Sequence, residues 1–240
     1  MHKILSISFL VLFALSANTH AQTFKVFKGD TINRTDADGE KQGEWRKYYK
    51  SDNLFTAGKF IDDVAIGDWK TYYESGEVSG TVTYSNNAKK IKQTSYYKSG
   101  EVKAKGNYIE LKKDSLWTYY KPGNTLASIE TYKLGEAHGP WKVYYANGQK
   151  SLEEFYVEGD RQGAAFEYFK DGTKKSASNY VNDKLNGVFI LYHTNGSIWK
   201  KGVYKSGLKQ GVWVNHNLKG QKESEQVFKD GFPVEEPLNE

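Results

Sequence analysis

The side chains that could do chemistry in this chain are few, and their spacing does not favour catalysis. The five histidines are His2, His20, His138, His193 and His216. No two of them have the spacing of a zinc-ligand pair. Adjacent acids such as Glu153 and Glu154 would point to opposite faces of an extended strand, which prevents paired acid–base action. Since no Gly-x-Ser-x-Gly motif is present either, the sequence predicts no enzyme, no resident metal and no cofactor.

One acidic stretch, Asp36-Ala37-Asp38-Gly39-Glu40, has the alternating pattern of a calcium-binding loop. The bidentate acid that closes such a loop is missing at the expected place. Aspartate side chains also accept hydrogen bonds from nearby backbone N–H groups in ordinary turns. We therefore expect an Asx turn in this stretch rather than a calcium site.

Tryptophan and tyrosine are the only side chains whose pattern suggests a binding function, and aromatic residues make up 15% of the chain. Exposed aromatic stripes bind partner proteins through buried anchors or stack on sugar rings. The candidate partner-binding residues are Trp45, Trp69, Trp117, Trp141, Trp213, Tyr49, Tyr73, Tyr97 and Tyr145. Two interpretations are open: these rings only hold the fold together, or one stripe of them also forms a binding groove.

A repeat of 24 residues determines where these rings lie, and its clearest copy runs from Gly139 to Gly148. Position one falls on Gly43, Gly67, Ile91, Ser115, Gly139, Gly163, Gly187 and Gly211. Two residues later stand Trp45, Trp69, Gln93, Trp117, Trp141, Ala165, Phe189 and Trp213. Each copy ends on a closing aromatic residue, in order Phe60, Tyr84, Tyr108, Tyr132, Tyr156, Tyr180, Tyr204 and Phe228. A fixed period of this length is typical of a repeat architecture.

Three copies depart from the pattern without changing its length. The third has Ile91 and Gln93 in place of the glycine and the tryptophan. The fourth, Trp117 to Gly123, is expected to turn one residue early and to have a second strand that is one residue longer. In the sixth copy, Phe166 is expected to take the place of the tryptophan that is missing at Ala165.

Each copy is predicted to form a β-hairpin, because its Trp-x-x-Tyr-Tyr run is rich in strand-forming residues. Three residues that end in glycine, such as Ala146-Asn147-Gly148, suit a type I turn closed by a left-handed residue. With that turn, Tyr48 would pair with Leu54 and Tyr72 with Val78. A looser connection, such as Lys133 to His138, would lead to the next copy.

Side-chain alternation predicts two different aromatic faces. One face would carry the first tyrosine of each copy, an aliphatic residue, a small residue or glycine, and the closing aromatic residue. The other would carry the tryptophan and the second tyrosine. Glycines on the second strand, Gly58, Gly106 and Gly202, are expected to be covered by neighbouring rings. Since no segment has a helical period, the predicted fold is all-β: an elongated antiparallel meander of repeated hairpins in a single twisted sheet.

The pattern Gly-x-Trp-x-x-Tyr-Tyr-x-x-Gly, followed by an aromatic residue and Gly-x-x-x-Gly, resembles the variant form of the MORN (membrane occupation and recognition nexus) repeat. The resemblance extends over residues 36–231. Signal-bearing chains of this kind also look like the YwqK-family antitoxins of bacteria. The resemblance implies an elongated β-sheet scaffold for protein or lipid contact, and the antitoxin label implies neutralisation of a partner toxin.

The N-terminus has the pattern of a secretory signal peptide. A basic start, Met1-His2-Lys3, precedes an apolar run from Ile4 to Leu15 and a small, polar exit that ends at Ala21. No second apolar run follows, so no transmembrane segment is expected in the mature chain. The predicted organisation is a signal peptide (1–21), an N-terminal capping segment (22–42), the repeat array (43–234) and a C-terminal tail (235–240). We therefore expect export to the periplasm, the cell envelope or the medium of a bacterium.

The leading functional hypothesis is a non-enzymatic exported scaffold that binds a partner protein through an aromatic face, with an antitoxin-like role as one form of it. One alternative is a module that binds cell-wall or extracellular glycan. The other is a binder of lipid at a membrane surface. The formal charge of +5 is spread over interspersed residues, so a nucleic-acid partner is not expected. The sequence leaves the identity of the partner and the oligomeric state open.

Overall fold

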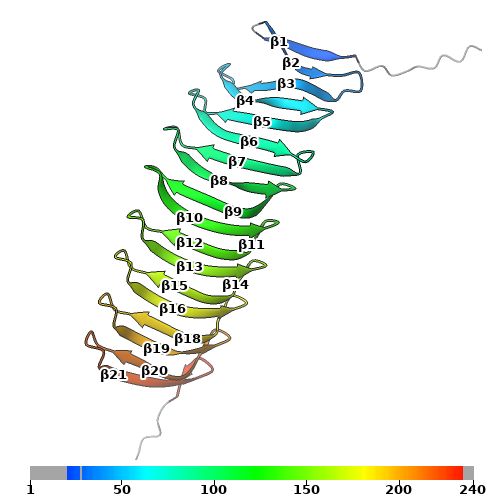
Figure 1. Cartoon of the computed structure of the whole chain (residues 1–240). Coiled ribbons are helices and arrows are strands. Elements are labelled where there is room, and N and C mark those ends of the chain that lie inside the picture. Colours follow the sequence, from blue (N-terminus) through cyan, green and yellow to red (C-terminus); the bar gives the residue numbers. More distant parts are fainter. Residues whose placement is uncertain (1–20, 28, 235–240) are drawn as a thin grey trace, which may run out of the picture.

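The computed structural model describes residues 21–27 and 29–234, and all regular structure in this part of the chain is β. Twenty-two strands form one sheet in which every pairing is antiparallel and joins strands close in the chain order. The strands succeed one another in chain order across a long, curved array, from the first described strand at one end to the last at the other (Figure 1). The predicted all-β meander in a single sheet is confirmed. The predicted signal peptide, apart from Ala21, and the tail at 235–240 lie outside the described residues.

Two strands precede the first copy and one follows the last. The N-terminal hairpin is β1 (Thr23–Phe27) and β2 (Asp30–Thr35). The first four copies contain β3 (Lys41–Tyr48), β4 (Leu54–Ile61), β5 (Val64–Tyr72), β6 (Val78–Ser85), β7 (Lys90–Tyr96), β8 (Val102–Ile109), β9 (Lys112–Lys121) and β10 (Thr125–Lys133). The next three contain β11 (Glu136–Ala137), β12 (Gly139–Tyr144), β13 (Lys150–Val157), β14 (Asp160–Arg161), β15 (Gly163–Tyr168), β16 (Lys174–Val181), β17 (Lys184–Leu185), β18 (Gly187–Tyr192) and β19 (Ile198–Lys205). The eighth copy contains β20 (Leu208–His216) and β21 (Lys222–Lys229), and β22 (Phe232–Pro233) follows it.

Position one of the repeat marks a bulge in the first strand of the hairpin in every copy from the second to the eighth except the third. In the fifth copy, Tyr132 pairs with Ala137 on one side of the bulge, and Ile129 pairs with Lys142 on the other. The first strand therefore contains two more residues than its partner over this stretch. Gly139 has a φ of 98°, in the left-handed region that glycine adopts at little cost. This requirement explains why position one is glycine in six of the eight copies.

The third copy keeps the sheet in register without the bulge. Pairing there is continuous from Gly80↔Ser95 to Ser85↔Lys90. The two residues that other copies place in the bulge lie instead in a longer turn, residues 86–89. Ile91 therefore has ordinary strand geometry and is 7% exposed, which explains why a branched residue is tolerated at position one.

Two kinds of turn alternate along the array. At one edge, the Gly76 N–H donates to Tyr73 O (2.9 Å) and the Tyr73 N–H donates to Glu77 O (2.8 Å), as a type I turn with a left-handed third residue requires. The predicted pairs Tyr72↔Val78 and Tyr48↔Leu54 are confirmed.

Two predictions about the connections were wrong. The turn of the fourth copy is not early: it occupies the usual three positions, because Lys121 pairs with Thr125 and Asn124 (φ 55°) takes the left-handed place of the glycine. The other part of that prediction is confirmed, since the second strand β10 has 9 residues and β8 has 8. At the opposite edge, the supposedly loose connection is a tight turn: Leu134 and Gly135 (φ 48° and 96°) join the paired residues Lys133 and Glu136. Positive φ at both central residues is typical of a type I′ turn, which suits the twist of the strands.

The predicted distribution of rings between the two faces was also wrong. Tyr72 pairs with Val78, but Thr71 pairs with Gly80, so Ser79 is an extra residue in the second strand. A slip of one residue moves the following side chains to the other face. As a result, the tryptophan and the closing aromatic residue lie on the same face, here called the aromatic face. The first tyrosine lies on the other side, here called the opposite face.

Rings that cover glycines supply much of the burial in this single-layer sheet. A Cβ atom added at Gly106 would lie 2.3 Å from Trp117 Cδ2. The corresponding distances are 2.0 Å for Gly58 with Trp69 and 2.1 Å for Gly202 with Trp213. The prediction that rings cover these glycines is therefore confirmed.

Replacing Gly106 with alanine tests this contact. The added methyl group would overlap the Trp117 ring, so we expect Gly106→Ala to lower the free energy of unfolding by about 1–3 kcal/mol. Gly80→Ala is the matched control. Its methyl group would lie 2.8 Å from Thr71 Oγ1, on a side chain that can rotate, and 3.5 Å from Thr94 O, an ordinary van der Waals contact. Urea unfolding of both variants measures the difference, and equal destabilisation would contradict the role given to the ring.

Candidate functional site

Tryptophan and closing aromatic rings alternate along the aromatic face. In the first two copies the ring centroids of Trp45 and Phe60 are 5.6 Å apart, those of Phe60 and Trp69 5.0 Å, and those of Trp69 and Tyr84 6.1 Å. The interplanar angles of these pairs are 81°, 79° and 79°, an edge-to-face geometry. Such contacts stabilise a pair by about 0.5–1.5 kcal/mol beyond the burial of its area.

The row of rings is interrupted where the repeat departs from its pattern, at Gln93 and at Ala165. Phe166 does not replace the missing ring, and the prediction that it would was wrong. It pairs with Ala177, whereas Ala165 pairs with Ser178, so strand alternation places Phe166 on the opposite face. The fifth copy retains a complete group, in which Trp141 lies 5.4 Å from Tyr132 and 4.8 Å from Tyr156.

The five predicted tryptophans lie together on this face but differ in exposure. The rings of Trp117 and Trp213 are 3% and 4% exposed, so they offer almost no surface to another molecule. Trp45, Trp69 and Trp141 are half-buried. If this face binds a partner, these three rings have the surface to contact it.

The predicted tyrosines Tyr49, Tyr73, Tyr97 and Tyr145 are half-buried and join one copy to the next. Their hydroxyl groups donate to backbone carbonyls 23 residues further on: Tyr49 to Tyr72 O (2.8 Å), Tyr73 to Tyr96 O (2.7 Å), Tyr97 to Tyr120 O (2.8 Å) and Tyr145 to Tyr168 O (2.7 Å). His193 makes the equivalent contact from Nε2 to His216 O (2.9 Å). These hydrogen bonds link neighbouring hairpins, a role that the sequence pattern alone did not reveal.

Cations lie against the rings in several copies. In the first, fourth and eighth copies a lysine stands two residues before position one, and its ammonium group lies between the tryptophan and the closing aromatic ring. The distances from Nζ to the ring centroids are 5.7 and 5.2 Å for Lys41, 5.0 and 4.8 Å for Lys113, and 4.8 and 4.7 Å for Lys209. The sixth copy places Arg161 over Tyr180 at 4.2 Å. These contacts have the geometry of cation–π interactions.

Two carboxylates, Glu130 and Glu154, also belong to the aromatic face. Glu130 accepts hydrogen bonds from Ser128 Oγ (2.8 Å) and from the Tyr132 hydroxyl (2.7 Å). Glu154 accepts one from the Tyr156 hydroxyl (2.7 Å). Burial raises the pKa of both tyrosines above the ordinary value, and the hydrogen bonds to the carboxylates raise it further. The sequence analysis did not identify these acids. A signal for them was present, because the other copies have glycine or another neutral residue at the same position.

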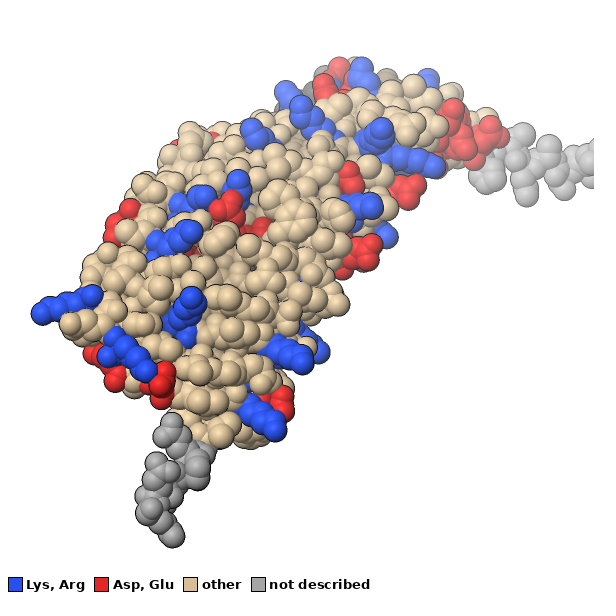
Figure 2. Space-filling model, turned by 60° about the horizontal axis from the view of Figure 1, so that its bottom comes forward, with Lys and Arg blue, Asp and Glu red and all other residues tan. Residues whose placement is uncertain are grey.

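The opposite face is charged near the N-terminus and apolar near the C-terminus. Near the N-terminus Lys59 Nζ lies 3.1 Å from Glu44 Oε1. The equivalent positions of the last two copies hold two direct pairs of valines, Val188↔Val203 and Val212↔Val227, whose exposures are 49%, 42%, 51% and 37%. Contiguous exposed apolar residues are a feature of interaction surfaces. On the side shown in Figure 2, charged groups of both signs are scattered among uncharged residues.

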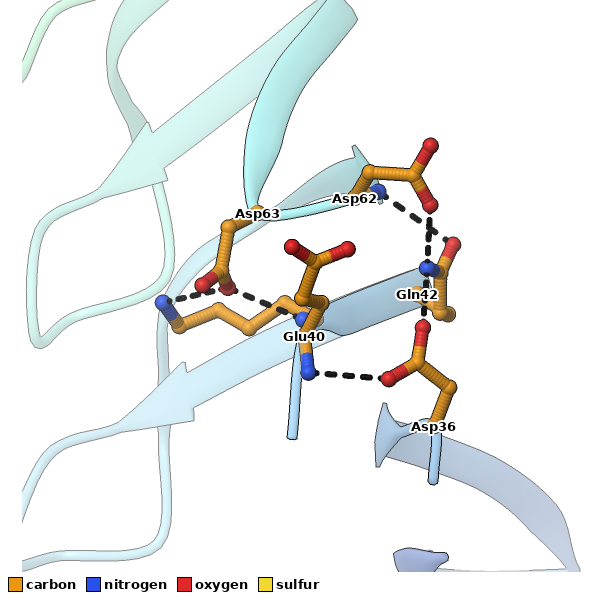
Figure 3. A network of polar contacts seen from close by, with 6 residues as sticks. Asp36, Glu40, Gln42, Asp62 and Asp63 are labelled. Atoms are coloured by element: carbon orange, nitrogen blue, oxygen red, sulfur yellow. Dashed lines mark hydrogen bonds and ion pairs between the residues drawn. The ribbon is translucent and has the colours of Figure 1, made fainter. Parts of the chain in front are cut away.

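The acidic stretch near the N-terminus forms a hydrogen-bonded corner (Figure 3). The backbone N–H groups of Asp38 and Glu40 both donate to Asp36 Oδ1 (3.0 Å each), which confirms the predicted Asx turn. Carboxylate oxygens of Asp36, Glu40 and Asp62 lie within 4.8 Å of one another. Gln42 Nε2 donates to both Asp36 (2.7 Å) and Asp62 (2.6 Å), so a neutral amide bridges two of these three acids.

Electrostatics in this corner follow from the hydrogen bonds and the crowding. The Gln42 amide and the Glu40 N–H lower the pKa of Asp36. Partial desolvation and repulsion from Asp36 and Asp62 raise the pKa of Glu40.

Comparison with known families supports the repeat interpretation. Residues 66–86, 90–110, 137–158 and 185–206 match the family model of the MORN repeat variant. One of these matches covers the third copy, which has lost both its glycine and its tryptophan. No curated protein has significant sequence similarity to the chain. Within the described residues there is also no helix long and apolar enough to cross a membrane.

Solved structures give only distant similarity. The crystal structure of TcdB2-TccC3 matches at 13% identity with a TM-score of 0.24, over 83% of this chain and 13% of that one. The TcdB2-TccC3-Cdc42 structure matches at 11% identity with a TM-score of 0.16, over 83% and 15% of the two chains. A porin-like protein from Bacteroides uniformis matches at 11% identity with a TM-score of 0.19, over 80% and 92%. This chain therefore spans a small part of the first two, and the low scores support no functional argument.

A tyrosine–phenylalanine exchange tests the link between copies. We expect Tyr73→Phe to lower the free energy of unfolding by about 0.5–1.5 kcal/mol, because the hydrogen bond to Tyr96 O is lost. Phe169 occupies the same repeat position without a hydroxyl group, so Phe169→Tyr should raise the free energy of unfolding by a similar amount. Urea unfolding measures both, and a destabilised Phe169→Tyr variant would show that the hydrogen bond is not the cause.

Proposed function

Because the chain contains MORN repeat variants, we propose that it is a non-enzymatic repeat scaffold that binds a partner protein through the aromatic face of its sheet. The supporting observation is that the sheet is a single layer. In the described part of the chain, no helix or second sheet packs on either face. Both broad faces are therefore free to meet another molecule over the length of the array.

The side chains of the aromatic face suit a protein contact. Trp45, Trp69 and Trp141 are half-buried, so each ring is held in place by its neighbours and keeps one part of its surface accessible. Rigid aromatic anchors of this kind contribute most of the binding energy at protein interfaces. Their rotamers are already restricted, which lowers the entropy lost on binding.

Two other ligands remain competing explanations. A glycan would stack on the same half-buried indoles, and a membrane surface would meet the valines of the opposite face. An antitoxin-like role is a special case of binding to a partner protein. We also propose that the scaffold is exported. Co-expression with the protein encoded by the neighbouring reading frame tests the antitoxin case. If that protein is toxic and co-expression does not reduce its toxicity, the antitoxin role is contradicted.

A pair of matched alanine-to-glutamate variants tests which face binds. Ala65 lies on the aromatic face beside Trp69, whereas the exposed Ala164 lies on the opposite face. We expect an affinity resin carrying the wild-type protein or Ala164→Glu to capture the same protein from the cell envelope fraction, and Ala65→Glu to capture at least about tenfold less, because a charge is introduced among apolar anchors.

Tryptophan emission during titration with oligosaccharides and with anionic vesicles provides the second measurement. The protein proposal predicts no saturable change with either ligand. Saturable quenching by an oligosaccharide would replace it with glycan binding, and a saturable response to vesicles would replace it with membrane binding. Loss of capture in Ala164→Glu alone would move the contact to the opposite face.

A further inference from the structure

The lysines of the repeat define a place where an ammonium group fits. Lys41, Lys113 and Lys209 stand two residues before position one in their copies, and each ammonium group lies between a tryptophan and a closing aromatic ring. The backbone places two of them alike, since Lys113 pairs with Tyr108 and Lys209 with Tyr204, whereas Lys41 pairs with Thr35. Three copies thus show the same cation in the same surroundings.

The fifth copy has these surroundings without the cation. Ala137 stands at the lysine position and pairs with Tyr132, as Lys113 pairs with Tyr108. The rings of Trp141 and Tyr156 are in contact, with centroids 4.8 Å apart. No lysine or arginine of the described chain lies over either ring within cation–π distance.

Two carboxylates flank this pair of rings. Trp141 pairs directly with Glu154 on β13. On β10, Glu130 pairs directly with Trp117. Its repeat equivalents Gly58 and Gly106 lie under the tryptophan of the following copy, so Glu130 lies on the aromatic face between Trp117 and Trp141. The hydroxyl groups of Tyr132 and Tyr156 hold these carboxylates by hydrogen bonds of 2.7 Å each.

The negative charges of these two carboxylates are only partly balanced by cations of the chain itself. Glu130 has hydrogen bonds only from neutral hydroxyl groups and takes part in no ion pair among the described residues. Glu154 side-chain exposure is 11%, and its nearest cation, Arg161 Nη1, is 3.8 Å away and closer to Asp183, at 2.9 Å. Lys113 lies over Tyr132, on the side of the fourth copy. Two carboxylates beside electron-rich rings favour a cation from outside.

The second copy shows what is special about the fifth. Ala65 also replaces the lysine there, beside the rings of Trp69 and Tyr84. Its tryptophan, however, is flanked by Gly58 and Val82 rather than by carboxylates. The second copy therefore provides a natural control with the rings but without the acids.

We propose that Trp141, Tyr156, Glu130 and Glu154 form a binding site for an alkylammonium group, namely a lysine side chain of a bound protein. The ammonium group takes the place that lysine fills in the first, fourth and eighth copies. The inference deepens the proposed function, since the partner supplies the lysine, but the site is testable without any partner.

Binding of a small probe tests the site directly. Nα-acetyl-lysine methylamide is titrated against the full chain, and acetyl-norleucine methylamide serves as the uncharged probe of similar size. The readout is the NMR signal of the Trp141 indole N–H, identified by its disappearance in Trp141→Phe. We expect saturable shifts with the lysine probe, weakened about three- to tenfold in Glu154→Gln and in Glu130→Gln, and no saturable shift with norleucine. Equal binding of both probes, or none of the lysine probe, would overturn the inference.

A tethered lysine provides the second test, which does not depend on removing any native group. We expect Ala137→Lys to lower probe binding at least about tenfold, because its own ammonium group fills the site, and to raise the Tm by about 2–4 °C. Ala65→Lys should leave probe binding at Trp141 unchanged and raise the Tm less. Undiminished probe binding in Ala137→Lys would overturn the inference, and so would tetramethylammonium binding more tightly than the lysine probe, which would assign the site to a quaternary head group.

The two proposals can fail separately. If the lysine probe binds at Trp141 but Ala65→Glu captures as much partner as the wild-type protein, the ammonium site stands and the proposed function fails. If capture depends on the aromatic face but the lysine probe does not bind, the scaffold function stands and the ammonium site fails.

Discussion

A tryptophan ring lying on a glycine of the neighbouring strand is the contact on which this sheet depends. A single-layer sheet has no facing layer that could bury its side chains, so burial must arise between neighbours on the same face. Trp69 covers Gly58 and is held edge-to-face between Phe60 and Tyr84. Each ring therefore needs the strands of two successive copies, and a single copy could not bury its own aromatic residues.

Uniform spacing of these rings requires that every copy advance the sheet by the same amount. Two bulges per hairpin are compatible with that requirement because each occurs at a fixed repeat position. The third copy shows how strict the requirement is: it lacks the bulge at Ile91, and a turn that is longer by two residues restores the length. Backbone register is maintained there although the side chains at two anchor positions have changed.

Differences between copies then become informative about function. The same backbone position recurs in every copy with other side chains. A residue that departs from the pattern in one copy is therefore not required by the backbone fold at that position. The acids at Glu130 and Glu154 and the missing lysine at Ala137 lie close together on one face, around Trp141. The hydrogen bonds of the second tyrosines, in contrast, recur from copy to copy, as expected of a structural role.

The sequence by itself determined the all-β class, the hairpin unit, the position of the glycine-closed turns and pairs such as Tyr72↔Val78, because these depend on local turn geometry and on a constant period. It also indicated that rings would cover Gly58, Gly106 and Gly202. Only the tertiary structure decided which face each ring occupies, since one extra residue at Ser79 reverses the alternation and leaves no mark in the period. It likewise decided which tryptophans remain accessible and that Glu130 lies beside Trp117 and Glu154 beside Trp141, because both depend on pairing between strands.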